Sequence, residues 1–266
     1  MPSSAPRPSR RLPHHPRQRV GQLFGLFFGA LLLVAACARP APPARTTPPA
    51  NPLAQEVERL RENDPNQDPE TALTPLRDQT GTPAGLARVR ALRLLGRFGE
   101  AVAEANRLIL ATPDLPEAFV ERARTFYAMG NNERALEDCA AALQLAPGNT
   151  DALMAQGDMF FVLEMPESAE ASYSRAIETA PDNPLAFINR GVARDEQGHY
   201  ADAIADYTRA ISLNPASASA FANRGVSRSQ TGDMAGMCAD YRRACVLGLC
   251  RRLDDARLMG YCQSPR

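Results

Sequence analysis

Bulky apolar and small residues recur along the chain every 34 positions. Phe119, Leu153, Phe187 and Phe221 share this period, and small residues follow four positions later at Ala123, Gly157, Gly191 and Gly225. A second set begins with Ala135, Ala169 and Ala203, continues with Tyr173, Tyr207 and Tyr241, and closes with Pro113, Pro147, Pro181 and Pro215. Spacings of three and four place residues on one face of an α-helix. The pattern therefore predicts an all-α array of helix pairs, each burying its apolar faces against its neighbours.

This succession of residues resembles the tetratricopeptide repeat (TPR) family. Five units in register are expected at residues 82–115, 116–149, 150–183, 184–217 and 218–251. The resemblance implies a solenoid of helix-turn-helix repeats, and residues 252–266 are expected to form a C-terminal capping helix and tail. The first unit carries Gly85 and Val89 where later units have a bulky and a small residue. Arg194 and Arg228 replace large apolar residues of the family pattern, and we interpret both as structural, with stems over apolar surface and solvated heads.

The first 36 residues have the layout of a secretory signal peptide. Five arginines and no acidic residue precede an apolar run from Leu23 to Ala36. Fourteen helical residues span about 21 Å, less than the roughly 30 Å of a bilayer core, so a transmembrane helix is the weaker interpretation. Val34-Ala35-Ala36-Cys37 resembles the lipobox of bacterial lipoproteins, which implies lipidation of Cys37 and, with Ala38 following, delivery to the outer membrane. A plain signal peptide with a chance cysteine is the alternative.

A proline-rich segment follows Cys37. Six of the fourteen residues from Arg39 to Pro52 are proline, a composition that favours extended polyproline II rather than a packed core. We interpret residues 37–52 as a tether. Residues 53–81 are expected to be poorly ordered or to hold one short helix.

Composition and charge exclude several functions. All thirty basic residues are arginine and balance thirty acidic residues, so no net positive charge favours nucleic-acid binding. Beyond the leader the only histidine is His199, in a predicted turn, which does not suffice for a catalytic triad. No phosphate-binding loop is recognised. We predict a non-enzymatic protein with no cofactor, no metal and no catalytic residue.

Four cysteines cluster at the C-terminal end of the chain: Cys238, Cys245, Cys250 and Cys262. Their spacing has no CxxC pair typical of zinc sites, and an exported protein is in a disulfide-forming environment, so disulfides are favoured over free thiols or metal. Cys238 and Cys245 are about 10.5 Å apart along one helix, too far to pair. If the capping helix runs back along the last repeat, Cys238 pairs with Cys262 and Cys245 with Cys250. Cys139 is expected to be a buried, inert thiol.

The TPR resemblance implies a concave groove lined by the first helix of each repeat. The candidate peptide-binding residues are Arg124, Asp158, Ile188, Asn189, Val192, Asp195, Glu196 and Asn223. Asn189 and Asn223 are either ligands of an extended peptide backbone or helix-packing residues. The function expected is an outer-membrane, periplasm-facing lipoprotein that presents this groove to envelope proteins. The alternative is a dedicated pilotin-like or outer-membrane assembly factor.

Overall fold

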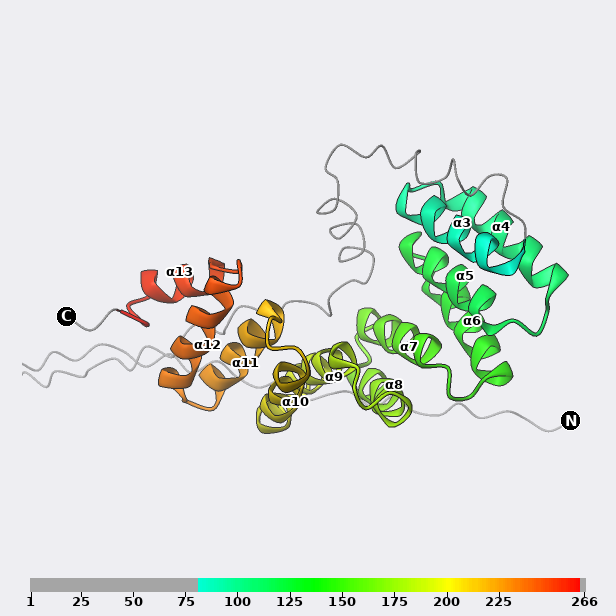
Figure 1. Ribbon diagram of the computed structural model, residues 1–266. Coiled ribbons are helices and arrows are strands. Elements are labelled where there is room, and N and C mark those ends of the chain that lie inside the picture. The colour runs from blue at the N-terminus through cyan, green and yellow to red at the C-terminus, as the bar shows by residue number, and fades with distance from the viewer. Residues whose placement is uncertain (1–80, 264–266) are drawn as a thin grey trace, which may run out of the picture. The chain divides into compact units, whose positions relative to one another are not determined.

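The computed structural model describes residues 81–263, and eleven helices make up this part of the chain (Figure 1). The expected signal peptide, Cys37, the expected tether and most of residues 53–81 lie outside the described residues. The helices are α3 (Thr82–Leu94), α4 (Phe98–Ala111), α5 (Pro116–Ala128), α6 (Asn132–Leu145), α7 (Thr150–Val162), α8 (Pro166–Thr179), α9 (Pro184–Glu196), α10 (Tyr200–Leu213), α11 (Ala218–Gln230), α12 (Met234–Val246) and α13 (Arg251–Leu258). None of them is long and apolar enough to cross a bilayer.

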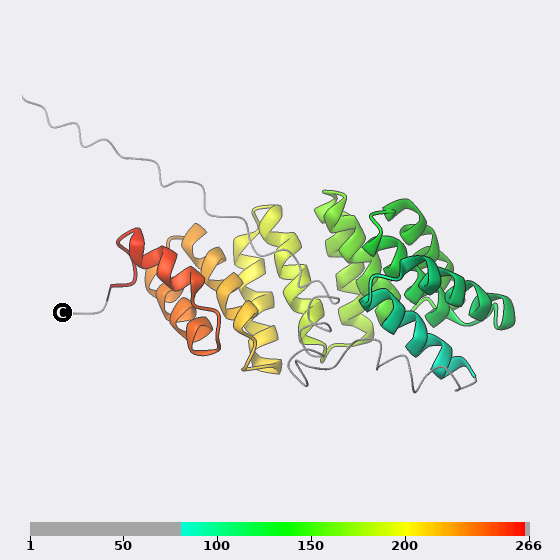
Figure 2. The ribbon, with the colours of Figure 1, turned by 90° about the horizontal axis from the view of Figure 1, so that it is seen from above.

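The helices pack as five consecutive pairs followed by a single C-terminal helix, which confirms the predicted repeat array. Each first helix contacts the second helix of its own repeat and that of the preceding repeat. Neighbouring pairs follow one another along the array in both views (Figures 1 and 2). The turns within the pairs use left-handed glycines, such as Gly198 at φ +79°, whereas the third repeat has Glu164 at φ +58° in the same position.

First helices of adjacent repeats also contact one another. The contacts join α3 to α5, α5 to α7, α7 to α9 and α9 to α11, whereas second helices of adjacent repeats contact each other less. The array therefore curves toward its first helices. We call α3, α5, α7, α9 and α11 the inner layer.

Complementary side-chain sizes hold the two helices of each repeat together. Gly191 on α9 faces Tyr207 on α10, and a Cβ at Gly191 would lie 2.8 Å from the tyrosine ring. Gly157 and Gly225 have the same relation to Tyr173 and Tyr241. The aromatic ring therefore needs glycine opposite it. In the first repeat the space beside Gly85 is filled by the side chain of Leu108, which explains how this divergent unit still packs.

An arginine on the first helix of a repeat joins it to the second helix of the same repeat and to the preceding repeat. Arg190 donates to both carboxylate oxygens of Asp206 on α10, at 3.0 and 2.7 Å, and to Ser174 of the preceding repeat at 3.2 Å. Its guanidinium also lies over the Phe187 ring. Arg122 and Arg224 make the corresponding contacts, with Asp138 and Asn106 and with Asp240 and Thr208. The third repeat differs, because Gln156 and Ser172 form a neutral hydrogen bond there at 3.2 Å.

Arg194 and Arg228 have a more specific role than covering apolar surface. Arg194 bonds to Asp206 at 2.8 Å and to Glu170 at 2.8 Å, and Arg228 bonds to Asp240 at 2.8 Å. The structural role expected of both arginines is therefore confirmed, with ion pairs added to it. These guanidinium groups are partly buried and neutralise the carboxylates of the second helices.

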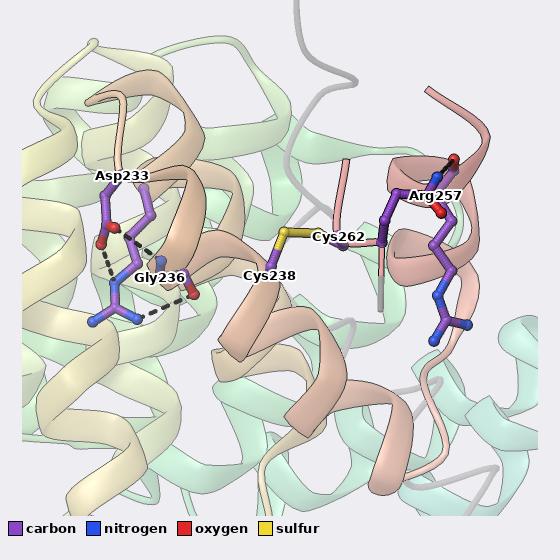
Figure 3. Close-up of a disulfide and its surroundings, with 7 residues drawn as sticks. Asp233, Gly236, Cys238, Arg257 and Cys262 are labelled. Atoms are coloured by element: carbon purple, nitrogen blue, oxygen red, sulfur yellow. Dashed lines mark hydrogen bonds and ion pairs between the residues drawn. A yellow bond between two sulfur atoms is a disulfide. The ribbon is translucent and has the colours of Figure 1, made fainter. Parts of the chain in front are cut away.

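The C-terminal cap is joined covalently to the last repeat. The structure contains disulfides between Cys238 and Cys262 and between Cys245 and Cys250, the pairs expected from the sequence. Figure 3 shows the first of them linking α12 to the segment after α13, with Asp233 capping the start of α12 through the backbone N–H of Gly236. Leu253 and Ala256 of α13 complete a small core with Val226 and Tyr241. The end of the array is thus closed by both apolar contacts and disulfides.

Candidate peptide-binding surface

All the residues predicted to bind a peptide lie on the inner layer. Arg124 is on α5, Asp158 on α7, Ile188, Asn189, Val192, Asp195 and Glu196 on α9, and Asn223 on α11. Only Glu196 is exposed and Arg124 is partly exposed, whereas the other six are buried. The structure thus gathers them on one set of helices but limits their contact with solvent.

Ile188 and Val192 belong to the core of the fourth repeat. They pack in one cluster with Phe187, Ala203 and Tyr207, and Val192 is fully buried. Their packing holds α9 in position. A peptide-binding role for these two residues stays a prediction.

Asn189 connects two repeats through its side-chain amide. Its Nδ2 donates a hydrogen bond of 3.0 Å to Oδ1 of Asp158 on α7. Its Oδ1 is buried and accepts no hydrogen bond from any described residue. Asn189 therefore packs α9 against α7 and still keeps a free acceptor, so both roles considered for it remain compatible with its geometry.

Asp158 is a buried carboxylate held by neutral groups. Oδ1 accepts from the Tyr173 hydroxyl at 2.8 Å as well as from Asn189. Burial raises the pKa of Asp158 from 3.8 to about 7, although the two hydrogen bonds and the positive charge of Arg124 act in the opposite direction. The carboxyl group thus changes its charge near neutral pH.

Asp195 occupies a similar environment in the next repeat. Its Oδ2 accepts from the Tyr207 hydroxyl at 2.8 Å, and Ser227 of α11 donates to the same carboxylate at 2.7 Å. Burial raises the pKa of Asp195 from 3.8 to about 6, opposed by the hydrogen bonds from Ser227 and Tyr207. Two adjacent repeats therefore present the same combination of a buried carboxylate and a tyrosine hydroxyl.

The other buried carboxylates of residues 81–263 all have arginine partners. Glu104 pairs with Arg88 and Arg107, Glu121 with Arg90, Arg93 and Arg124, Asp138 with Arg122, Asp206 with Arg190 and Arg194, and Asp240 with Arg224 and Arg228. Asp158 and Asp195 form no ion pair with any described residue. They are the two buried acids in this part of the chain that form no ion pair.

Arg124 is already engaged by acidic residues of the inner layer. It donates to Glu121 at 3.0 Å and to Asp151 of the next repeat at 2.9 Å. Glu121 is almost fully buried and also accepts from Arg90 at 2.8 Å. Arg124 therefore links α5 to α7.

No group of three or more potential metal ligands occurs among residues 81–263. Cys139 is buried, and this burial raises the pKa of its thiol to about 12. The thiol therefore stays protonated at neutral pH and is a poor nucleophile. His199 is an exposed residue at the start of α10.

The sequence pattern does not identify Tyr173, Tyr207 and Ser227 as carboxylate-binding residues. The 34-residue period marks both tyrosines as packing residues. The structure shows that their rings do pack between helices, while their hydroxyl groups reach Asp158 and Asp195. A buried tyrosine hydroxyl needs a polar partner. This requirement is the one feature of the sequence that could have indicated a polar group opposite each tyrosine.

The paired helices, the inner layer and the closed end define a helical-repeat scaffold. Comparison with known families specifies which one: tetratricopeptide repeat models match residues 120–184 and residues 184–217. The described part of the chain therefore has the all-α helical array of tetratricopeptide repeats. A comparison with curated proteins gave no match.

Several solved structures share this fold. The TPR protein TTC0263 of Thermus thermophilus aligns with a TM-score of 0.56 and 21% identity over 66% of this chain and 98% of that chain. MamA from Desulfovibrio magneticus RS-1 aligns with a TM-score of 0.54 and 17% identity, over 61% and 94%. YrrB, described as a TPR protein with an unusual peptide-binding site, aligns with a TM-score of 0.53 and 16% identity, over 75% and 97%. At these identities the similarity establishes the fold.

Proposed function

We propose that this protein is a non-enzymatic scaffold that binds a protein or peptide partner along its inner layer. The observation that carries the proposal is the contact of each first helix with the next, which aligns one row of side chains over five repeats. An extended peptide can contact such a row without any catalytic group. YrrB, which shares the fold, is described as having a peptide-binding site, and this supports the same use of the fold here.

We also propose that the scaffold acts in the bacterial cell envelope, attached to the outer membrane through a lipid on Cys37. The positively charged leader, its apolar run and the small residues before Cys37 support it. Two disulfides at the C-terminal end support export as well, because disulfides persist in oxidising compartments and are rare in the cytosol. The proline-rich residues 39–52 would then hold the repeats away from the bilayer.

Replacement of Cys37 tests the anchor. The Cys37→Ala variant should move from the membrane fraction to the soluble envelope fraction, because acyl chains supply the membrane affinity of a lipoprotein. Fractionation followed by immunoblotting measures this change. Full retention of the variant in membranes would contradict a lipid anchor at Cys37.

Charge reversal on the inner layer tests the binding role. Glu196 is exposed at the end of α9, whereas Glu178 is exposed on the second helix α8, so Glu196→Arg and Glu178→Arg form a matched pair. Partners of the tagged full chain would be crosslinked in membranes and identified by mass spectrometry. We expect a discrete partner whose yield falls with Glu196→Arg and persists with Glu178→Arg.

Equal yields with both variants would contradict binding along the inner layer. A single membrane-embedded partner that is also lost with Cys37→Ala would instead favour the dedicated pilotin-like or outer-membrane assembly function.

A further inference from the structure

Two buried acids of the inner layer stand apart from all the others in residues 81–263. Asp158 and Asp195 have no arginine partner, although five other buried carboxylates in this region have at least one each. We propose that Asp158 and Asp195 receive the basic side chains of an extended peptide that binds along the inner layer. This inference rests on the proposed function and specifies the chemistry of the ligand.

The hydrogen bonds of Asp158 leave one carboxylate oxygen available. Tyr173 and Asn189 both donate to Oδ1, and no described residue donates to Oδ2. A carboxylate can accept hydrogen bonds at both oxygens, and a guanidinium or ammonium group is the strongest available donor. The unused oxygen is therefore a suitable partner for a ligand cation.

Asn189 provides a second acceptor beside this carboxylate. Its Oδ1 is buried without a donor, while its Nδ2 is bound to Asp158. An unsatisfied buried acceptor destabilises the free protein, so its retention calls for a physical reason. The planar guanidinium of arginine has five N–H donors and can bond to a carboxylate and an amide oxygen at the same time.

Asp195 is the second buried carboxylate without an ion pair, one unit further along, although both of its oxygens already accept hydrogen bonds. Ser227 donates to both of its oxygens, at 2.7 and 2.9 Å, and Tyr207 donates to Oδ2 at 2.8 Å. These donors are neutral and orient the carboxylate without neutralising it. The adjacent Glu196 adds a second negative charge and helps to raise the pKa of Asp195. Two negative sites in adjacent repeats match a peptide with two basic residues.

A purely structural role for these acids predicts a different response to substitution. If the Asp158 carboxylate only joined helices, Asp158→Asn would weaken packing. In our proposal an unpaired buried charge destabilises the free protein, so Asp158→Asn raises the melting temperature and weakens ligand binding. The oxygen of the new amide can still accept from Tyr173 and from Asn189.

The test uses the full chain in detergent and a synthetic peptide with the sequence of residues 39–45, Arg-Pro-Ala-Pro-Pro-Ala-Arg, blocked at both ends. Its prolines keep it extended. A second peptide carries citrulline, the neutral isostere, in place of both arginines. Isothermal titration should show at least roughly tenfold weaker binding for the citrulline peptide and for Asp158→Asn or Asp195→Asn.

Asp206→Asn is the matched control, because Asp206 is equally buried but paired with Arg190 and Arg194. It should lower the melting temperature and leave peptide affinity unchanged. Asp158→Asn should raise the melting temperature by a few degrees. A lower melting temperature for Asp158→Asn would overturn the proposal.

Equal binding of the arginine and citrulline peptides would overturn this inference while supporting peptide binding as such. Binding of neither peptide would also overturn it, whereas capture of a partner that depends on Glu196 would still support the proposed function. The double variant Arg39→Ser with Arg45→Ser identifies the source of the ligand. If the added peptide binds this variant more tightly than the wild type, the chain's own tether competes for the site and is a source of the basic ligand. If binding is unchanged, the proposal holds with a separate protein as the source of the ligand.

Discussion

Asp206 and Asp158 belong to adjacent repeats and are similarly buried, yet their surroundings differ. Asp206 lies between Arg190 and Arg194, with oxygen–nitrogen distances of 2.7 and 2.8 Å. Asp158 is held by Tyr173 and Asn189, which carry no charge. The comparison shows that one repeat architecture can use a buried carboxylate either to join helices or to keep a negative site on the inner layer.

The position of each carboxylate accounts for this difference. Asp206 is on a second helix, where arginines of the first helix of its own repeat reach it. Asp158 is on a first helix and accepts hydrogen bonds from Asn189 of the inner layer and from Tyr173 of the second helix of its own repeat. A ligand bound along the inner layer therefore approaches Asp158 and not Asp206.

The largest expected effect comes from removing a paired charge. Asp206→Asn leaves two partly buried guanidinium groups without a counter-charge, and we expect the free energy of unfolding to fall by about 2 to 3 kcal/mol. Urea denaturation at pH 8 measures the change. An unchanged midpoint would show that the arginine pairs do not stabilise the repeats.

The opposite change is expected at Asp158. Asp158→Asn should increase the free energy of unfolding at pH 8 by about 2 kcal/mol, because the buried charge is removed. The pKa of Asp158 is about 7 in the folded chain and about 4 in the unfolded chain, so the folded protein retains a proton between these pH values. Wild-type stability therefore decreases as pH rises through this interval.

The difference in the free energy of unfolding between Asp158→Asn and the wild type should accordingly be small at pH 4 and reach its full value above pH 7. Denaturation curves of both proteins across this range measure it. A difference that does not vary with pH would contradict the assignment of the effect to the charge of Asp158.

A smaller effect of the same sign is expected at Asp195. Its pKa is raised to about 6, and its carboxylate receives hydrogen bonds from Ser227 and Tyr207. Asp195→Asn should stabilise the protein by about 1 kcal/mol at pH 8, with the change concentrated between pH 4 and pH 6. Thermal unfolding at several pH values would reveal it, and a loss of stability at pH 8 would mean that the carboxylate hydrogen bonds outweigh desolvation.

The smallest effect concerns the third repeat, where a neutral pair replaces the arginine pair. Gln156→Arg combined with Ser172→Asp places an arginine and an aspartate where Arg190 and Asp206 stand in the fourth repeat. We expect a gain of roughly 0.5 kcal/mol, because the added attraction is largely offset by desolvation. A double-mutant cycle measures the interaction energy between the two new side chains. An interaction energy of zero would mean that these pairs stabilise the repeats through packing alone.

The fold could be predicted from the sequence because its determinants are periodic. The glycines opposite Tyr173, Tyr207 and Tyr241 recur every 34 residues, and each fits an aromatic ring from the second helix. In the first repeat Gly85 stands where later repeats have a bulky residue, and the structure compensates with Leu108, a contact between helices that periodicity does not reveal.

The candidate site was predicted less completely because its two buried acids do not follow the 34-residue period. Tyr173 and Tyr207 are 34 residues apart, but Asp158 and Asp195, to which they bond, are 37 residues apart and occupy different positions of the repeat. Their shared environment becomes visible only when the helices are in place. The sequence did select both acids and Asn189 for the inner layer, but it did not reveal that neither acid forms an ion pair with an arginine.

The proposed peptide site depends on Asp158 being an unpaired buried carboxylate in the free protein. Its titration can be followed by carbonyl-carbon NMR of the full chain, with the signal assigned by its absence in Asp158→Asn. We predict a midpoint near pH 7 in the free protein and a lower midpoint when the arginine peptide is bound. A midpoint near pH 4 in the free protein, unchanged by the peptide, would contradict this assignment.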